Sequence, residues 1–179
     1  MTRYIGIDVG GNGAERRIAK PAHPLWIATT FLFSYLFNLA GAAVGTLWMP
    51  DFLALTLIYW TIRDPRHVGM SVAFVCGILM DIHYGTVLGQ QALAYVILSY
   101  CAYSLHRRLP WFGPFGQAFH ILPLLLVAQI IVLLIRLWFD GLWPGMPWFL
   151  QSFTGAACWP LLTVIFSLPE RRSEKENAL

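Results

Sequence analysis

Apolar runs divide the chain into six segments, which are separated by short polar or aromatic turns. The pattern predicts membrane-spanning helices at residues 25–47, 52–62, 68–82, 88–105, 119–139 and 149–168. About 20 apolar residues are needed to cross a bilayer as a helix, so the second and third segments are short and need a thinner bilayer or covering neighbours. We therefore expect an all-α integral membrane protein with six transmembrane helices in one bundle.

Polar residues 1–24 and 169–179 are predicted to be the N-terminal and C-terminal tails, which precede and follow the bundle in the sequence. Most basic residues lie in these tails and in the turns at residues 63–66 and 107–108, whereas the intervening turns carry the acids Asp51, Asp81 and Asp140. Arg136, four residues before Asp140, can pair with it on one helix face. Because Lys and Arg mark the cytoplasmic side of a membrane protein, six spans with both termini in the cytoplasm fit every turn.

Composition supports the same class. The chain has 179 residues, of which 58% are hydrophobic and only 12% charged, whereas soluble domains average about 25% charged residues. The net charge of +3 is small and gives no reason to expect a nucleic-acid partner. The lipid bilayer is the expected surrounding.

A row of small residues crosses the third segment. Gly69, Ala73 and Gly77 recur every four positions, and the series continues through Asp81 to Gly85. Positions four apart lie along one side of a helix, and such rows let helices approach closely in lipid. The row is either an ordinary packing face or a groove for a partner or a neighbouring span.

Asp81 is the acid at the end of this row. It lies fifteen residues after Arg66, or about 22 Å along a helix, which is less than the roughly 30 Å of the hydrocarbon core. An acid at that depth usually faces a cavity, a partner helix or a pairing group. The alternative is an acid at a helix–loop junction that water reaches.

The sequence indicates no reaction centre. Cys76, Cys101 and Cys158 all lie in apolar runs and are typical of small buried side chains. The five histidines form no i,i+4 pair of the kind that binds zinc, and Asp81 has no second intramembrane acid to pair with. We expect no metal, no cofactor and no catalytic residue.

Several short motifs resemble one known family. They are Pro50-Asp51-Phe52, the run Leu57–Trp60, Pro65, and the run Ala73–Gly89, which contains Phe74, Gly77, Asp81, Gly85 and Gly89. Trp159-Pro160, which we expect to bend the last segment, is also similar to the family's end. Together these residues resemble the rod shape-determining protein MreD family.

This resemblance implies a function that composition does not. Members of the family act in the bacterial elongasome, bind the bitopic protein MreC directly, and connect through it to MreB and to the RodA–class B penicillin-binding protein synthase, with no established catalysis. The resemblance therefore implies a hetero-oligomeric scaffold in the inner membrane that supports side-wall peptidoglycan synthesis and rod shape. The family's fold is also similar to that of the substrate-binding subunits of energy-coupling-factor transporters, so a small-molecule or lipid-binding subunit is the alternative.

Overall fold

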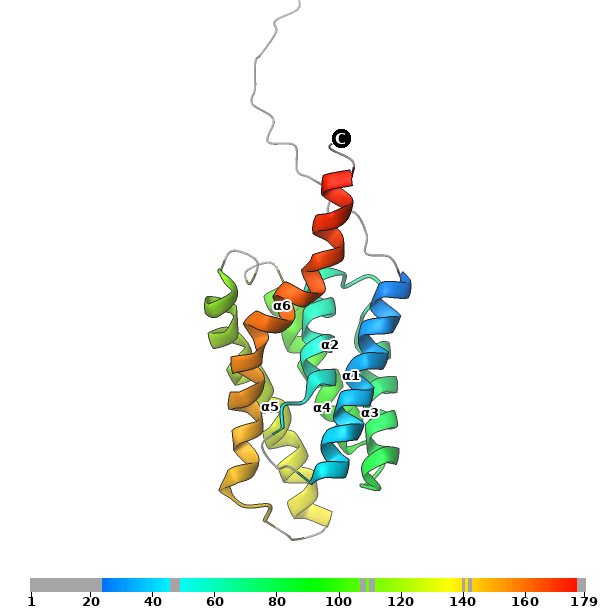
Figure 1. Cartoon of the computed structure of the whole chain (residues 1–179). Helices are drawn as coiled ribbons and strands as arrows, with labels where there is room; N and C mark the ends of the chain where they lie inside the picture. Colours follow the sequence, from blue (N-terminus) through cyan, green and yellow to red (C-terminus); the bar gives the residue numbers. More distant parts are fainter. Residues whose placement is uncertain are drawn as a thin grey trace, which may run out of the picture.

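The computed structural model describes residues 24–45, 49–106, 109, 112–139, 141 and 143–176. Over this part of the chain the structure is helical and contains no strand (Figure 1). The predictions for the N-terminal tail, for the turn at residues 107–108 and for an Arg136–Asp140 pair lie outside the described residues. The helices are α1 (Pro24–Val44), α2 (Phe52–Arg63), α3 (Met70–Tyr84), α4 (Gln90–Leu105), α5 (Pro114–Phe139) and α6 (Leu150–Glu176), with a short 3₁₀ helix at Met146–Phe149 before α6.

Six α-helices agree with the number expected from the apolar pattern. Two bounds differ clearly, because α5 begins at Pro114 and α6 continues to Glu176 through residues predicted to be a tail. Three helical regions are long and apolar enough to cross a membrane, namely Pro24–Ala42, Phe115–Phe139 and Met146–Ser167, whereas α2 and α3 are shorter apolar helices. The assignment of all six helices as spans stays a prediction.

Helix α2 forms the centre of the bundle. Every residue from Leu53 to Thr61 is buried, as expected for a helix that is apolar on all sides. Trp60 is fully buried and its indole Nε1 donates a hydrogen bond of 2.8 Å to Thr30 Oγ1 of α1, while Thr61 and Ser99 join α2 to α4 through their hydroxyls. The neighbouring helices therefore cover the shortest helix of the bundle.

The remaining helices surround this centre in a simple order. Helix α4 packs against α2, α3 and α5, and α5 packs against α6. Helices α1 and α3 lie at the edge, since the main packing partner of α1 is α2 and that of α3 is α4. Figure 1 shows the helices running side by side, with the α3–α4 turn and the ends of α1 and α5 at the lower end of the bundle.

Prolines mark two changes of direction. Pro65 follows the C-cap Asp64 of α2, a common place for proline because it cannot continue a helix. Pro160 lies inside α6 after the buried Trp159, and it has no N–H for the carbonyl of Ala156. Figure 1 shows that α6 changes direction in its upper half, which agrees with the expected bend.

Candidate functional site: a polar cavity at the lower end

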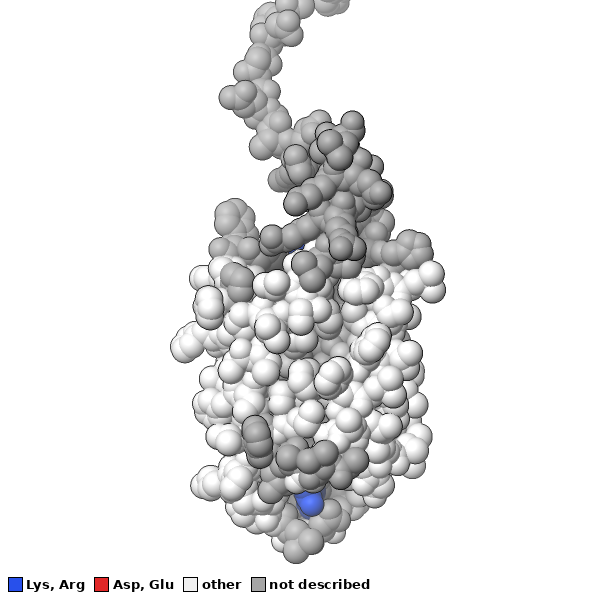
Figure 2. All heavy atoms as spheres, in the orientation of Figure 1, with Lys and Arg blue, Asp and Glu red and all other residues white. Residues whose placement is uncertain are grey.

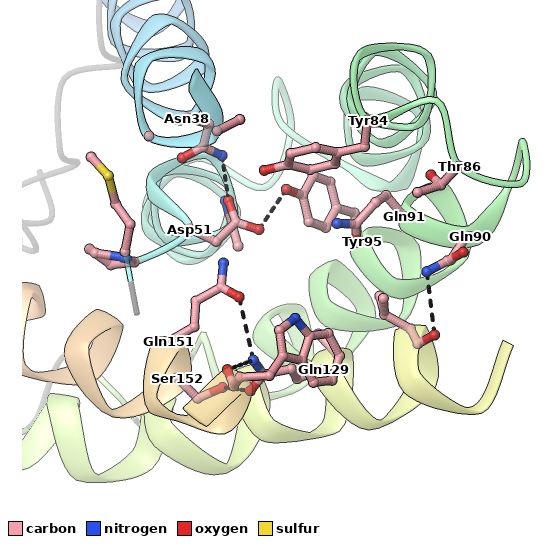
Figure 3. Close-up of a pocket in the computed structure, with 18 of the residues that line it drawn as sticks. Asn38, Asp51, Tyr84, Thr86, Gln90, Gln91, Tyr95, Gln129, Gln151 and Ser152 are labelled. Carbon is pink, nitrogen blue, oxygen red and sulfur yellow. Dashed lines mark hydrogen bonds between the residues drawn. The ribbon is translucent and has the colours of Figure 1, made fainter. Parts of the chain in front are cut away.

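A cavity of about 650 Å³ lies at the lower end of the bundle, among the ends of all six helices (Figure 3). We call it the lower cavity. Its wall is rich in amides and hydroxyls, and it also contains Pro50 and Gly85 of the sequence motifs. The polar side chains of the wall are those of Asn38, Asp51, Tyr84, Thr86, Gln90, Gln91, Tyr95, Gln129, Arg136, Gln151 and Ser152.

Asp51 organises the side of the cavity formed by α1 and α2. It is the N-cap of α2, and its Oδ1 accepts hydrogen bonds from Ala54 N at 3.0 Å and from Asn38 Nδ2 at 2.7 Å. Its Oδ2 accepts a hydrogen bond of 2.7 Å from the hydroxyl of Tyr95 in α4. The carboxylate thus ties α1 and α4 to the start of α2 and faces the positive end of that helix.

Gln129 organises the opposite side, where α5 meets α6. Its Nε2 donates to the carbonyl of Trp148 at 2.7 Å and to Gln151 Oε1 at 3.4 Å, while its Oε1 accepts from the hydroxyl of Ser152. Gln90 of α4 similarly donates to the carbonyl of Val132 in α5. These bonds hold three glutamine side chains at the cavity wall (Figure 3).

Other polar groups of the wall make no hydrogen bond within the described chain. They are the hydroxyl of Tyr84, the side-chain amide of Gln91, Nε2 of Gln151, Oε1 of Gln90 and the guanidinium of Arg136. Figure 3 shows Tyr84 and Gln151 extending toward the middle of the cavity from opposite sides. The lower cavity therefore offers both donors and acceptors, and one cation, to a molecule inside it.

Asp81 lies near this cavity but does not line it. Its side chain is fully buried, and the carboxylate accepts hydrogen bonds from Gly89 N and Gln91 N, both at 2.8 Å, and from Ala92 N and Thr86 Oγ1, both at 3.3 Å. It therefore caps the first turn of α4 from the preceding helix. These bonds place Asp81 at a helix–turn junction, one of the two alternatives that the sequence leaves open, and contact of Asp81 with a partner stays a prediction.

The small-residue row packs inside the chain. Ala73 and Gly77 are buried, and a Cβ added to Gly77 would lie 2.3 Å from Cα of Ala92 in α4. The neighbouring span that fills the groove is thus α4. Gly69 has open space around its Cα, and Phe74 is 53% exposed on the outer side of α3.

Two glycines of the motif form the turn that brings Asp81 to α4. Gly85 has φ 60° and is the C-cap of α3, and Gly89 has φ 102° and is the N-cap of α4. Both conformations are left-handed, a region that strongly favours glycine. Their role is therefore to shape the turn, and Gly85 also borders the lower cavity.

Sequence reasoning missed the polar wall, although it carried a signal. Gln129 interrupts the apolar helix α5, and Gln90, Gln91 and Gln151 lie in the first turns of the apolar helices α4 and α6. Polar residues at membrane depth often mark functional sites. Because the glutamines of α4, α5 and α6 are far apart in the sequence, the sequence alone does not show that they line one cavity. Among the described residues, no group of three or more His, Cys, Asp or Glu side chains comes together in a way that could hold a metal ion.

Comparison with known proteins agrees with the motifs. The sequence model of the family described as rod shape-determining protein MreD matches residues 22–142. Rod shape-determining protein MreD of Haemophilus influenzae is 23% identical over 151 residues, which cover 82% of this chain and 91% of the relative. No solved structure matches the chain. Since the family match covers well over half of the sequence, this membrane protein belongs to the rod shape-determining MreD family.

Proposed function

We propose that the protein is a scaffold or regulator of the bacterial elongasome that supports side-wall peptidoglycan synthesis and rod shape. Membership of the MreD family supports the role in shape. The proposed direct partner is MreC, with MreB and the RodA–class B penicillin-binding protein synthase reached through it. The proposed location is the inner membrane, with both termini in the cytoplasm, and we propose no catalytic activity.

One observation carries this proposal, namely the uncovered outer face of α3. The side of α3 with the small residues packs against α4, and α3 has no other main packing partner in the bundle. Its outer side exposes large apolar side chains, which are Phe74, Val75, Leu79 and Ile82. A bitopic partner has a single transmembrane helix, and such a helix can lie along this face by close packing.

A matched pair of substitutions tests the docking face. We expect Val75→Trp to reduce copurification of MreC at least about tenfold, because a bulky side chain prevents close packing of two helices and each loss of about 1.4 kcal/mol lowers affinity tenfold. Leu161→Trp, at a position 65% exposed on α6, is the control for a lipid-facing residue. Cells with Val75→Trp should lose rod shape while protein abundance stays normal. Full MreC recovery with Val75→Trp would exclude this face.

The lower cavity favours a second candidate, a small-molecule or lipid-binding subunit with the fold of the energy-coupling-factor substrate-binding subunits. The six helices and the volume of about 650 Å³ support it, since ligand pockets commonly span about 300–1,000 Å³. A ligand that binds only the native state raises the melting temperature. We expect the melting temperature of protein purified without MreC to increase when a small solute or lipid is added.

A further inference from the structure

We propose that the lower cavity binds one ligand class, a phosphate or carboxylate group joined to a body rich in hydroxyl or amide groups. This inference rests on the second candidate function, ligand binding, and it does not depend on the docking face of α3. Both a lipid headgroup and a free solute can carry this chemistry.

The charges of the wall favour an anion. Asp51 and Arg136 are the two charged side chains among the described lining residues. Asp51 already receives three hydrogen bonds and lies at the positive end of α2. Arg136 lies in the last turn of α5 and makes no ion pair with a described carboxylate. The charge that a ligand can pair with is therefore that of Arg136, whose planar guanidinium suits phosphate and carboxylate groups.

The neutral groups favour a ligand with many hydrogen-bonding atoms. Tyr84 and Gln91 border the cavity from the α3–α4 side, while Gln151 approaches from α6 (Figure 3). Each has a donor that makes no hydrogen bond to another described residue, and Gln90 Oε1 adds a free acceptor. Hydroxyl and amide groups of a ligand can satisfy such donors and acceptors at the same time.

Buried polar residues around the lower cavity hold its wall in place. Asn38, Gln90, Tyr95, Gln129 and Ser152 are each at least nine-tenths buried, and their hydrogen bonds fix the groups that face the cavity. Amides and hydroxyls are costly among membrane helices unless they are satisfied. A ligand in the cavity would satisfy the groups that remain unpaired.

The position of the cavity leaves two sources for the ligand. It lies at the end of the bundle opposite to Arg63 and Arg66, which is the outer end if the charge distribution sets the orientation. Figure 2 shows a basic group at this end of the molecule and no acidic group among the described residues of the same face. A headgroup from the outer leaflet and an anionic solute from outside the membrane can both reach it.

Two sets of probes distinguish these sources. Native mass spectrometry of protein from nanodiscs of phosphatidylcholine, with and without phosphatidylglycerol, measures retained lipid. Melting temperatures in detergent with glycerophosphoglycerol or glucose 1-phosphate measure binding of free solutes. The same measurements are made on Arg136→Gln and on Arg66→Gln, an exposed arginine at the opposite end, which is the control for loss of a positive charge.

Binding of phosphatidylglycerol, or of either soluble phosphate, that weakens about tenfold or more in Arg136→Gln but not in Arg66→Gln supports the proposal, since hydrogen bonds to charged groups contribute about 1.5–3 kcal/mol. Binding of phosphatidylglycerol identifies the ligand as a lipid headgroup, whereas binding of either soluble phosphate identifies it as a free solute. Binding of maltose, an uncharged sugar added as a further probe, that is equal in the wild type and Arg136→Gln while the anionic probes do not bind would overturn the anionic class and leave ligand binding intact. If no probe binds, both the anionic ligand class and ligand binding by the lower cavity are overturned. This outcome does not depend on the result of the MreC copurification.

Discussion

At the scale of single residues, Asp81 shows how one buried carboxylate can define a turn. Its two oxygens accept four hydrogen bonds from residues five to eleven positions later in the chain. Three of the donors are backbone N–H groups at the start of α4, which otherwise lack partners within the helix. The negative charge also lies at the positive end of that helix. A fully buried acid is therefore compensated without a partner protein.

This geometry predicts that Asp81→Asn destabilises the protein. Asparagine keeps the shape, but its NH₂ group would face backbone N–H donors that need an acceptor. We expect a loss of about 2 kcal/mol, in the range for hydrogen bonds to charged groups, measured as a lower melting temperature in detergent. Asp64→Asn, which removes an acid paired with an exposed histidine, should cost under about 1 kcal/mol. Unchanged stability with lower MreC recovery would instead favour a partner-facing Asp81.

The sequence identified Asp81 as unusual, because an acid is rare in an apolar run, but it left its partners undetermined. The partners depend on the left-handed turns at Gly85 and Gly89, which fold the chain back on itself. Asp51 was similarly visible only as part of a turn, whereas its hydrogen bonds join α1, α2 and α4. Contacts between residues distant in sequence follow from helix packing, which hydropathy alone does not determine.

At the scale of elements, the contact between α3 and α4 depends on one glycine. A methyl group at Gly77 would lie within 3 Å of backbone atoms of Gln91 and Ala92. Backbone atoms cannot move aside as a flexible side chain can, so the helices must separate. At Gly69, the first residue of the same row, an added Cβ meets nothing within 4 Å.

We therefore expect Gly77→Ala to be destabilising and Gly69→Ala to be tolerated. Overpacking of this kind typically costs about 1–3 kcal/mol, whereas Gly69 has a negative φ of −117° that alanine can adopt. Thermal unfolding of both purified variants measures the difference. Similar melting temperatures for the two variants would show that the row is not in close contact with α4.

The helices themselves were largely predictable, and their ends less so. Long apolar runs bounded by prolines and charges placed α2 at 52–62 against the observed Phe52–Arg63. The predicted span 149–168 agrees with the apolar stretch Met146–Ser167, and α6 continues to Glu176 because helix propensity remains high in the Glu-, Arg- and Lys-rich sequence that follows. Hydropathy indicates which part of a helix lies in the membrane, and the helix itself can continue beyond that part.

At the scale of the whole molecule, the chain combines a conventional apolar bundle with a polar lower end. The apolar pattern predicted six helices, whereas the lower cavity requires the ends of all six helices to meet. The two proposed activities use different parts of this arrangement. The outer face of α3 lies along the bundle, and the cavity lies at the lower end of the bundle, so partner docking and ligand binding can be changed separately by substitution.

The predicted orientation of the bundle can be tested by cysteine labelling. Cys76, Cys101 and Cys158 are first replaced by serine or alanine, because all three are only partly buried. Arg66→Cys then places a single thiol in the exposed turn between α2 and α3, and Trp143→Cys places one in the connection between α5 and α6, where Trp143 is 53% exposed. The two positions lie at opposite ends of the bundle (Figure 1).

Because basic turns stay in the cytoplasm, a membrane-impermeant maleimide should label Trp143→Cys in intact spheroplasts and should label Arg66→Cys only after permeabilisation. The permeabilised sample also shows that each thiol is reactive, which separates protection by the membrane from protection by the protein. Labelling of Arg66→Cys in intact spheroplasts would overturn the six-span orientation. It would also move the lower cavity to the cytoplasmic side, where its ligand would have to come from the inner leaflet or the cytoplasm.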